Sequence, residues 1–258
     1  MTEQRHLSPI IFHIPHASTH IPPELRPSLI ISDAELRVEL LMMTDLHTDA
    51  IFGAAVKDGD AVIKFPVSRL VIDPERFVDD SEEPMSVQGM GVVYTNGHDG
   101  TALRANLDDK IRLVREYYIP HHAALSWAVD KQIKEFGRAL IVDCHSFPSS
   151  PLPYELNQNP SRPEICIGTD SFHTPAWLCD LLVGKFEHLG YSVGINEPFA
   201  GTIVPSKHIA MKEVASVMIE LRRDLYMNEA TGDFLSCGEK LSSDVAEAID
   251  TLRTVDTR

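Results

Sequence analysis

The chain has 258 residues, of which 43% are hydrophobic and 24% are charged, a balance typical of globular proteins and not of disordered ones. Its formal net charge of -15 disfavours binding to nucleic acid or to an anionic membrane surface, so we expect neither as a partner. The sequence has no apolar run of the ~20 residues that cross a bilayer, no N-terminal signal pattern and no CxxC pair, so we expect a cytoplasmic protein.

The first half of the chain is predicted to open with a buried strand and to continue through helices and short strands. The apolar run over 9–14 is β-prone and stops at Pro15, where a polar loop begins. Ser32, followed by Glu35, is typical of a capped helix start. The other elements expected here are a helix over 45–55, strands at 61–65 and 68–73, a strand at 91–95 within a loop at 79–100, and one or two helices over 101–136, interrupted near Pro120.

The second half contains the clearest strand of the sequence, at 139–146, where apolar residues are followed by polar ones. Further elements are predicted in the order strand 164–170, helix 174–190, strand 191–196, strand 215–226 and helix 242–252. Strands that alternate with helices predict one α/β domain over residues 1–258, with three α/β/α layers and a mixed, largely parallel central sheet. Open sheets of this kind place their sites at the carboxyl ends of the strands.

Two of the twelve histidines lie at predicted strand ends. His16 follows the first strand, and His145 follows the apolar residues of the strand at 139–146. We expect both side chains at the same edge of the sheet, close together although 129 positions separate them. Histidine is the commonest zinc ligand, and a catalytic zinc has three protein ligands and a fourth position for water. The pair therefore predicts a metal site.

The third ligand is expected to be a carboxylate or another histidine. Asp45, His47 and Asp49 are the candidates, and Asp45 is preferred, although acids at a helix start are also explained by the helix dipole. Asp143 precedes His145 by two residues and so shares its strand face. It is either a hydrogen-bonding partner that orients a histidine or a buried acid with a structural role.

Glu220 lies inside an apolar strand, where an acid is costly unless it is paired or functional. We interpret it as a candidate general base that takes a proton from a metal-bound water and passes it to a leaving amine. The alternative is a structural pair with Arg222 on the same strand face. Arg222 is also a candidate for substrate binding.

Arg69 and Arg76 flank Asp73 in the segment SRLVIDPERF. Arginine binds carboxylates through two parallel hydrogen bonds, so the two arginines are suited to an anionic substrate. A structural ion pair between Arg69 and Asp73 explains the first of them equally well.

Eight segments together resemble the N-formylglutamate amidohydrolase family, and they occur in the family's order. They are IPHAS at 14–18, TDLHTDAIF at 44–52, SRLVIDPER at 68–76, GVVYT at 91–95, PHHAAL at 120–125, DCHSFP at 143–148, NEPFAGT at 196–202 and IELRRDLYM at 219–227. The resemblance implies a phosphorylase/hydrolase-like α/β/α fold related to zinc carboxypeptidases and aspartoacylases. It also implies hydrolysis of N-formyl-L-glutamate to glutamate and formate, late in one route of histidine breakdown.

The resemblance also implies roles for single residues. His16, Asp45 and His145 match the positions that would bind one zinc ion, and Glu220 matches the general base. Arg69 and Arg76 match basic positions suited to the substrate's carboxylates, and His122, rather than His121, matches the histidine of the helix motif and is expected to bind substrate. The sequence departs from the family pattern at Ala17 and Ser18, at His121 and over 79–100.

The predicted function is therefore hydrolysis of N-formyl-L-glutamate, or of a similar N-acyl amino acid, by zinc-activated water. A carboxypeptidase-like enzyme is the alternative within the same chemistry, and an open groove would favour it over a small closed pocket. A non-catalytic protein that binds a metal or ligand is the alternative outside it.

Overall fold

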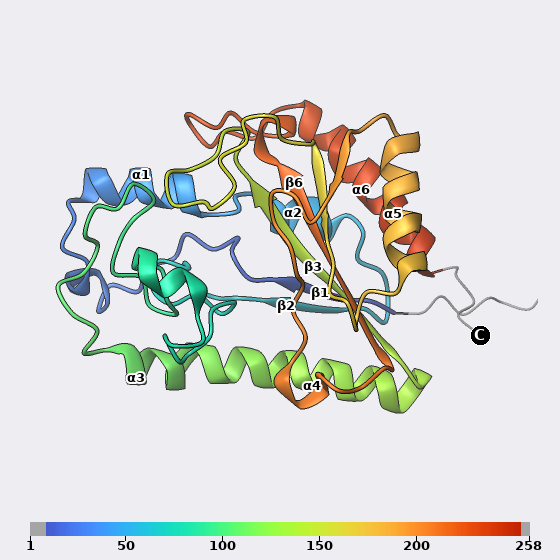
Figure 1. The fold of residues 1–258 in the computed structure, drawn as a ribbon, viewed down its shortest axis with the longest axis horizontal. Helices are drawn as coiled ribbons and strands as arrows, with labels where there is room; N and C mark the ends of the chain where they lie inside the picture. The colour runs from blue at the N-terminus through green and yellow to red at the C-terminus, as the bar shows by residue number, and fades with distance from the viewer. Residues whose placement is uncertain (1–8, 254–258) are drawn as a thin grey trace, which may run out of the picture.

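A six-stranded sheet forms the middle layer of the protein in the computed structural model, which describes residues 9–253 (Figure 1). The strands lie in the order β2-β1-β3-β6-β4-β5. The first four of these are parallel, β4 runs antiparallel to β6, and β5 is parallel to β4. Their bounds are Ile11–Ile14 for β1, Ala61–Lys64 for β2, Ala139–Phe147 for β3, Ile165–Gly168 for β4, Val193–Ile195 for β5 and Val214–Arg222 for β6. The predicted mixed, largely parallel sheet is confirmed.

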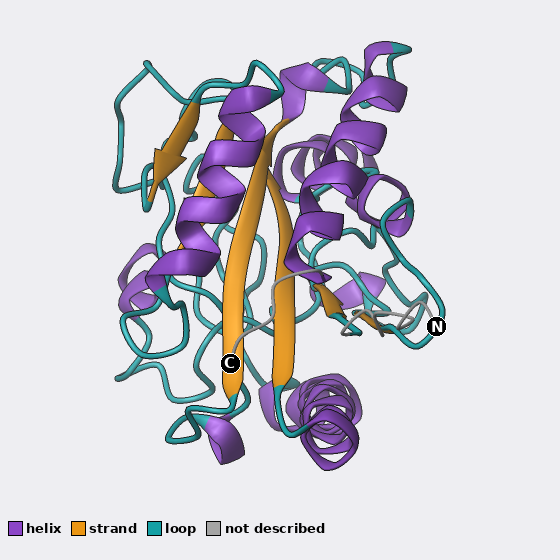
Figure 2. Cartoon of the chain, turned by 90° about the vertical axis from the view of Figure 1, so that its right-hand side faces the viewer, coloured by secondary structure: helices purple, strands orange, loops and turns teal. Residues whose placement is uncertain are grey.

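Helices cover both faces of this sheet, as Figure 2 shows with the helix α4 seen end-on below the long strands. The helix α4 packs on one face, and α2, α5 and α6 pack on the other. The helices are α1 (Asp33–Met43), α2 (Thr48–Gly53), α3 (Lys110–Leu113), a π-helix (Val114–Tyr118), α4 (Ile119–Phe136), α5 (Ala176–His188) and α6 (Cys237–Arg253), with short 3₁₀ helices at Arg26–Ser28, Pro84–Gln88, Ser206–His208 and Arg223–Leu225. Within residues 9–253, no helix combines the length and the apolar character needed to span a membrane.

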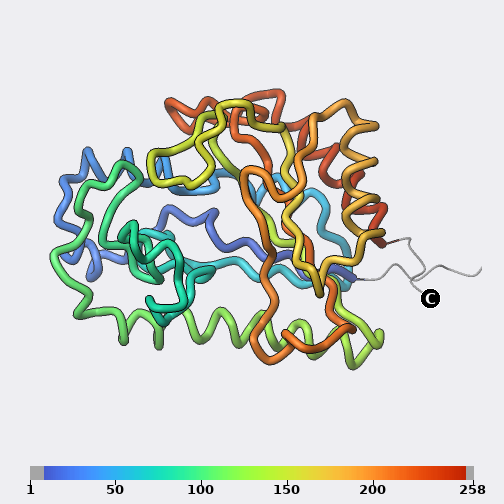
Figure 3. Tube along the Cα trace, in the orientation of Figure 1, coloured from blue at the N-terminus to red at the C-terminus, as the bar shows by residue number. Residues whose placement is uncertain are grey.

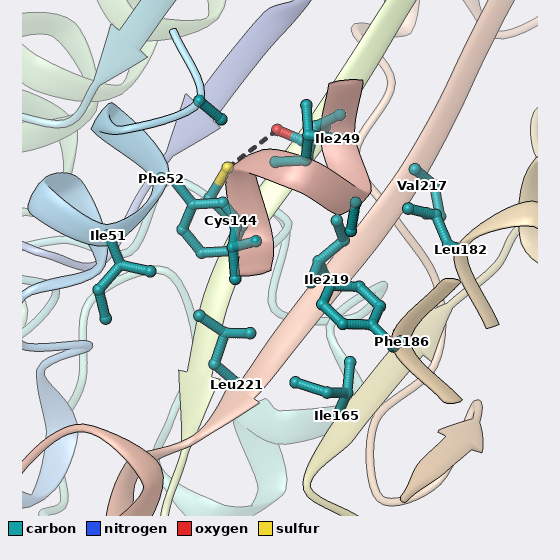
Figure 4. Packing of buried hydrophobic residues seen from close by; sticks show 14 of the residues in the cluster. Ile51, Phe52, Cys144, Ile165, Leu182, Phe186, Val217, Ile219, Leu221 and Ile249 are labelled. Carbon is teal, nitrogen blue, oxygen red and sulfur yellow. Dashed lines mark hydrogen bonds between the residues drawn. The ribbon is translucent and has the colours of Figure 1, made fainter. Parts of the chain in front are cut away.

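Side chains along the central strands alternate between the apolar core and the opposite face of the sheet. Ile219 and Leu221 of β6 and Cys144 of β3 belong to the core that α5 and α6 cover (Figure 4). Because side chains on a strand alternate between faces, Glu220 and His145 must point to the opposite face. β3 and β6 pair in a register that places these two polar residues opposite each other.

The segments predicted as strands at 68–73 and 91–95 are not strands, and these two predictions were wrong. The first forms a turn in which the Val71 amide donates to the Ser68 carbonyl and the Asp73 amide donates to the Val92 carbonyl. Its apolar residues Leu70, Val71 and Ile72 are nevertheless fully buried. The apolar run is thus explained by burial in a packed turn, which carries Arg69 and Asp73 on either side of it.

The long helical region differs from its prediction at its start and near Pro120. Residues 101–109 are not helical, and the helix begins at Lys110. The helix is not broken near Pro120, because the π-helix runs directly into α4, which contains the proline in its first turn. His121 and His122 therefore lie on one helix that continues without a break from the π-helix into α4.

Loops beyond the carboxyl ends of β1 and β2 build an irregular extension of the domain. The trace of residues 65–109 runs out past the end of the sheet in Figure 3, next to the helix α1. This extension contains its own buried clusters, which include Tyr94, Leu103 and Phe65. α1 begins with a full capping box between Ser32 and Glu35, which confirms the predicted helix start. The site therefore lies where the sheet ends and the extension begins.

Truncation of the core beneath the site should destabilise the whole domain. Ile219→Ala removes a fully buried side chain from β6, next to Glu220, and should lower the free energy of unfolding by roughly 2–5 kcal/mol. Val62→Ala, at a β2 residue that is 46% exposed, is the matched control and should change it by less than about 0.5 kcal/mol. Urea unfolding followed by circular dichroism measures both, and equal losses would contradict this account of the core.

Candidate metal centre

Three potential metal ligands from separate parts of the chain meet at the carboxyl edge of the sheet. His16 lies two residues beyond β1, Asp45 lies between α1 and α2, and His145 lies near the end of β3. All three are buried, and the two imidazole ring centroids are 5.1 Å apart. Asp45 Oδ2 is 3.3 Å from His145 Nδ1 and 3.8 Å from His16 Nδ1. The structure thus brings together the two histidines that the sequence predicted to converge.

Two of the inward-facing atoms have no hydrogen-bond partner within residues 9–253. His16 Nδ1 and Asp45 Oδ2 are both buried and unpaired. A buried polar atom without a partner costs about 1–3 kcal/mol, so such atoms are uncommon without a reason. A divalent cation between them would satisfy both, and two imidazole nitrogens with one carboxylate oxygen are the donor set of a catalytic zinc site. The residues present therefore fit a metal ion.

Carboxylates hold the outer nitrogens of both histidines. His16 Nε2 lies 2.9 Å from Asp73 Oδ1, and His145 Nε2 lies 3.0 Å from Asp143 Oδ1 and 3.2 Å from Glu75. An Nε2–H that donates to a carboxylate leaves the Nδ1 lone pair of the same ring free for a metal. Asp143 thus makes the histidine contact that the first of its two sequence interpretations expects, and Glu75 is a contact that sequence reasoning missed.

The other two candidates for the third ligand point elsewhere. His47 Nε2 is 2.8 Å from the carbonyl oxygen of Gly232, and Asp49 forms an ion pair with Lys64. Asp45 instead has its backbone amide 3.0 Å from the His16 carbonyl oxygen, which ties the two ligands together through the main chain. The geometry thus favours Asp45 among the three.

Charge at the centre is balanced by opposite effects of burial and of neighbouring groups. Burial acts to raise the pKa of Asp45, but the adjacent imidazoles of His145 and His16, together with the charge of Arg223, hold it well below its usual value. Burial acts to lower the pKa of His145, but Glu75 and Asp143 raise it well above its usual value. A metal that binds Nδ1 must therefore displace a proton, as is usual for imidazole ligands.

Glu220 lies opposite one of the three ligands and has an unused oxygen. It is opposite His145 in the register of β3 and β6, it is 6% exposed, and its Oε2 has no hydrogen-bond partner. Burial raises its pKa to about 7, to which the negative charge of Asp45 adds and which the positive charges of His145 and Arg223 oppose. A carboxyl group that titrates near neutral pH is suited to take up and release a proton.

The two arginines at the end of β6 have different surroundings. Arg222 does not pair with Glu220: its Nε donates to Asp224 over 2.7 Å and it contacts none of the three ligands. Arg223 is buried, and its Nη2 lies 3.0 Å from Asp45 Oδ1, with Nε 3.2 Å from Ser146. Sequence reasoning missed Arg223, although its place directly after a strand that carries Glu220 was a usable signal.

The buried turn at 68–76 places two further arginines near the centre. Arg69 donates to Asp73 through Nη2 over 2.8 Å and to Tyr94 through Nε over 3.0 Å, so the structural pair considered for it is present. Arg76 has no hydrogen-bond partner for its buried Nε, and its nearest acid, Glu83, is 3.8 Å away. The guanidinium of Arg76 is therefore the less engaged of the two.

His122 lies on α4, beside this turn and outside the group of ligands. Its Nε2 is 2.8 Å from the carbonyl oxygen of Pro74, and its ring stacks on Tyr118 with centroids 4.1 Å apart. These contacts hold the peptide between Asp73 and Glu75, so the structure gives His122 a role in supporting that turn.

Comparison with known proteins places the chain in a family. The model of the N-formylglutamate amidohydrolase family matches residues 8–227. The chain belongs to the N-formylglutamate amidohydrolase family. The resemblance read from the eight sequence segments is thereby confirmed.

Named relatives and two solved structures align over most of the chain. The N-formylglutamate deformylases of Pseudomonas aeruginosa and Pseudomonas putida are each 27% identical to it, over 86% of this chain and over 83% and 82% of their own lengths. The crystal structure of N-formylglutamate amidohydrolase from Ralstonia eutropha has a TM-score of 0.83 at 24% identity and covers 97% of this chain and 95% of its own. A gene product of Agrobacterium tumefaciens has a TM-score of 0.68 at 20% identity, with coverage of 96% and 92%. The two structures share the predicted α/β fold.

The raised pKa of Glu220 predicts a pH dependence of stability in metal-free protein. Because this pKa is about 7 in the fold and 4.5 ordinarily, the folded chain holds a proton that the unfolded chain releases between these values. The carboxyl therefore lowers stability as pH rises through that window. Between pH 4 and pH 8, the free energy of unfolding of Glu220→Gln should therefore rise relative to that of wild type by on the order of 3 kcal/mol.

Urea unfolding at a series of pH values, in the presence of a chelator, measures this difference. The exposed control Glu82→Gln should follow the wild-type curve. Parallel curves for Glu220→Gln and wild type would show that Glu220 has no raised pKa.

Proposed function

We propose that the protein is a zinc-dependent amidohydrolase that cleaves N-formyl-L-glutamate, or a similar N-acyl amino acid, into the free amino acid and formate or the corresponding acid. The names of the Pseudomonas and Ralstonia relatives support the substrate and the reaction. The observation that carries the proposal is the unpaired, buried state of His16 Nδ1 and Asp45 Oδ2 next to the free oxygen of Glu220. A metal ligand set and a proton carrier are thus adjacent.

One zinc ion per chain would be held by His16, Asp45 and His145. Bound there with an open position, zinc supplies a water of lowered pKa and polarises the amide carbonyl. Asp73 and Asp143 hold the two imidazoles by their outer nitrogens, which fixes the ring planes before substrate arrives. Arg223 neutralises the second oxygen of Asp45 and keeps its carboxylate in place.

Glu220 is the proposed general base and then general acid. It takes a proton from the attacking water, whose oxygen forms the new bond to the acyl carbon. As the carbon–nitrogen bond breaks, Glu220 returns that proton to the leaving nitrogen, so that the products are a carboxylic acid and an amine. Its pKa of about 7 allows both transfers near neutral pH.

Arg76 is the proposed partner for a substrate carboxylate. Its guanidinium has a buried Nε without a partner, whereas Arg69 is committed to Asp73 and Tyr94. We therefore assign Arg69 mainly to holding Asp73 and assign Arg76 to the substrate. His122 supports the turn that carries Arg76. Arg222 donates to Asp224 and to the Arg162 carbonyl, so we give it no part in the reaction.

Loss of either histidine ligand should abolish zinc binding. His16→Ala and His145→Ala each remove one of three ligands, so both purified variants should contain far less zinc than wild type. His47→Ala is the matched control, because His47 contacts Gly232 and not the centre, and it should keep its zinc. Elemental analysis after dialysis measures all three, and full occupancy in both ligand variants would refute the assignment.

Glu220→Gln should separate metal binding from catalysis. The variant keeps the size of the side chain but cannot carry a proton, so kcat for N-formyl-L-glutamate should fall by roughly 10²–10⁴-fold while zinc stays bound. Steady-state assays of formate release with parallel metal analysis test this. An unchanged kcat in a zinc-loaded variant would favour a different base, and no turnover of any N-acyl amino acid by wild type would favour a binding protein.

Arg76→Ala should weaken binding of a substrate carboxylate. Loss of a hydrogen-bonded ion pair of roughly 1.5–3 kcal/mol should raise KM for N-formyl-L-glutamate by about 10–100-fold. N-formylglutamine and N-formylglutamate α-amide each replace one of the two substrate carboxylates by an amide. For the analogue that lacks the carboxylate bound by Arg76, the substitution should raise KM much less. The exposed Arg37→Ala is the control. Equal effects on all three substrates would show that Arg76 does not bind a carboxylate.

A further inference from the structure

Two buried histidines next to the centre have no part in the proposed reaction. His13 lies on β1 and is fully buried, and His121 lies on α4 and is 6% exposed. Their Nε2 atoms are 2.8 Å apart, and the His121 ring also packs edge-on against Phe65, with centroids 4.9 Å apart. Burial of two imidazoles in contact is unusual, because an apolar pair would fill the same space without the cost of desolvation.

The pair is one end of a hydrogen-bonded chain that reaches a proposed zinc ligand. His13 Nδ1 is 2.7 Å from Asp143 Oδ1, and the same oxygen is 3.0 Å from His145 Nε2. The other oxygen of Asp143 accepts from the backbone amide of Ile203 over 3.1 Å. Asp143 is therefore held from three directions, by β1, by His145 of its own strand and by the loop before β6.

The partners of each ring nitrogen indicate where the hydrogens lie in this series of hydrogen bonds. A carboxylate only accepts, so both His13 Nδ1 and His145 Nε2 must carry a hydrogen. Burial, reinforced by His13 and His122, lowers the pKa of His121 to about 2, so the His121 ring is neutral. Of the two Nε2 atoms in contact, one donates and one accepts. Because the His13 Nδ1–H is used by Asp143, we assign the hydrogen between the two Nε2 atoms to His121.

We propose that His13 and His121 are positioning residues of the metal centre, which hold Asp143 so that His145 keeps its hydrogen on Nε2 and presents Nδ1 to the metal. The inference rests on the metal centre of the proposed function and adds two residues to it. His121 donates to His13, His13 donates to Asp143, and Asp143 accepts from His145. The chain joins α4, β1 and β3, so the helix on one face of the sheet helps to set the geometry of the ligand.

A pair of substitutions at His13 separates this role from simple packing. The side-chain amide of His13→Asn can donate to Asp143 as Nδ1–H does, whereas His13→Leu fills the space and donates nothing. His13→Leu should weaken zinc binding by about 10–100-fold, the usual cost of losing a partner that orients a ligand. His13→Asn should keep most of the affinity, and His121→Phe, which removes the donor to His13, should lie between the two.

The experiment is competition for zinc between each full-length variant and a chelator of known affinity. His173→Asn is the control, because His173 is buried at the opposite end of β6 and bonds only to backbone carbonyls, so its loss should lower stability without changing zinc affinity. Long-range proton–nitrogen NMR of the zinc-loaded protein gives a second readout. His145 should coordinate through Nδ1 in wild type and His13→Asn, and His13→Leu should show a mixture of signals.

The outcomes distinguish this inference from the proposed function. Absence of zinc binding by wild type would overturn the metal centre itself. Zinc binding by wild type with equal affinities in His13→Leu, His13→Asn and His173→Asn would leave the centre intact and overturn the positioning role. If His13→Leu does not fold, a His121→Phe variant with unchanged affinity and an unchanged His145 signal would overturn it equally.

Discussion

A concentration of buried charge at one edge of the sheet is the constraint on which this structure depends. Removal of a charged group from water costs several kcal/mol unless opposite charges or hydrogen bonds replace the lost solvation. The centre meets this cost by pairing almost every acid with a cation or an imidazole: Asp45 with Arg223, Asp73 with Arg69 and His16, and Asp143 with His13 and His145. Among the described residues, the unpaired buried atoms at the centre include His16 Nδ1, Asp45 Oδ2 and Glu220 Oε2, and Arg76 Nε is unpaired in the turn beside it.

The need to pair buried charges also explains why the site lies between the parallel strands and the irregular extension. The parallel strands supply His145 and Glu220 on a rigid frame, and the irregular extension supplies Asp73 and its arginines. The turn that carries them is as deeply buried as a strand would be, with its amides and carbonyls bonded to other loops. A buried loop is tolerated only when its backbone groups are satisfied in this way.

Sequence reasoning predicted the layers, the order of most elements and the convergence of His16 with His145, because strand ends are visible as an apolar run followed by polar residues. It failed at 68–73 and 91–95, where the apolar pattern reports burial but does not distinguish a strand from a packed turn. It preferred Arg222 to Arg223 and overlooked Glu75 and His13. The alternation of side chains along a strand does not predict the direction of a side chain beyond the strand's end. The contact between His13 and His121 depends on how α4 packs against β1, which the sequence pattern does not show.

The pairing of β3 with β6 has a consequence for how such an enzyme diversifies. Neighbouring strands are held about 4.7–4.9 Å apart by their backbone ladder, so the spacing between a ligand on one and a proton carrier on the other is a property of the sheet. The arginine that we assign to the substrate lies instead on an irregular segment, outside the strand pair that sets this spacing. The same turn also carries Asp73 and Glu75, whose carboxylates contact the imidazoles of His16 and His145, so a change in this segment reaches both the proposed substrate contact and the orientation of the proposed ligands.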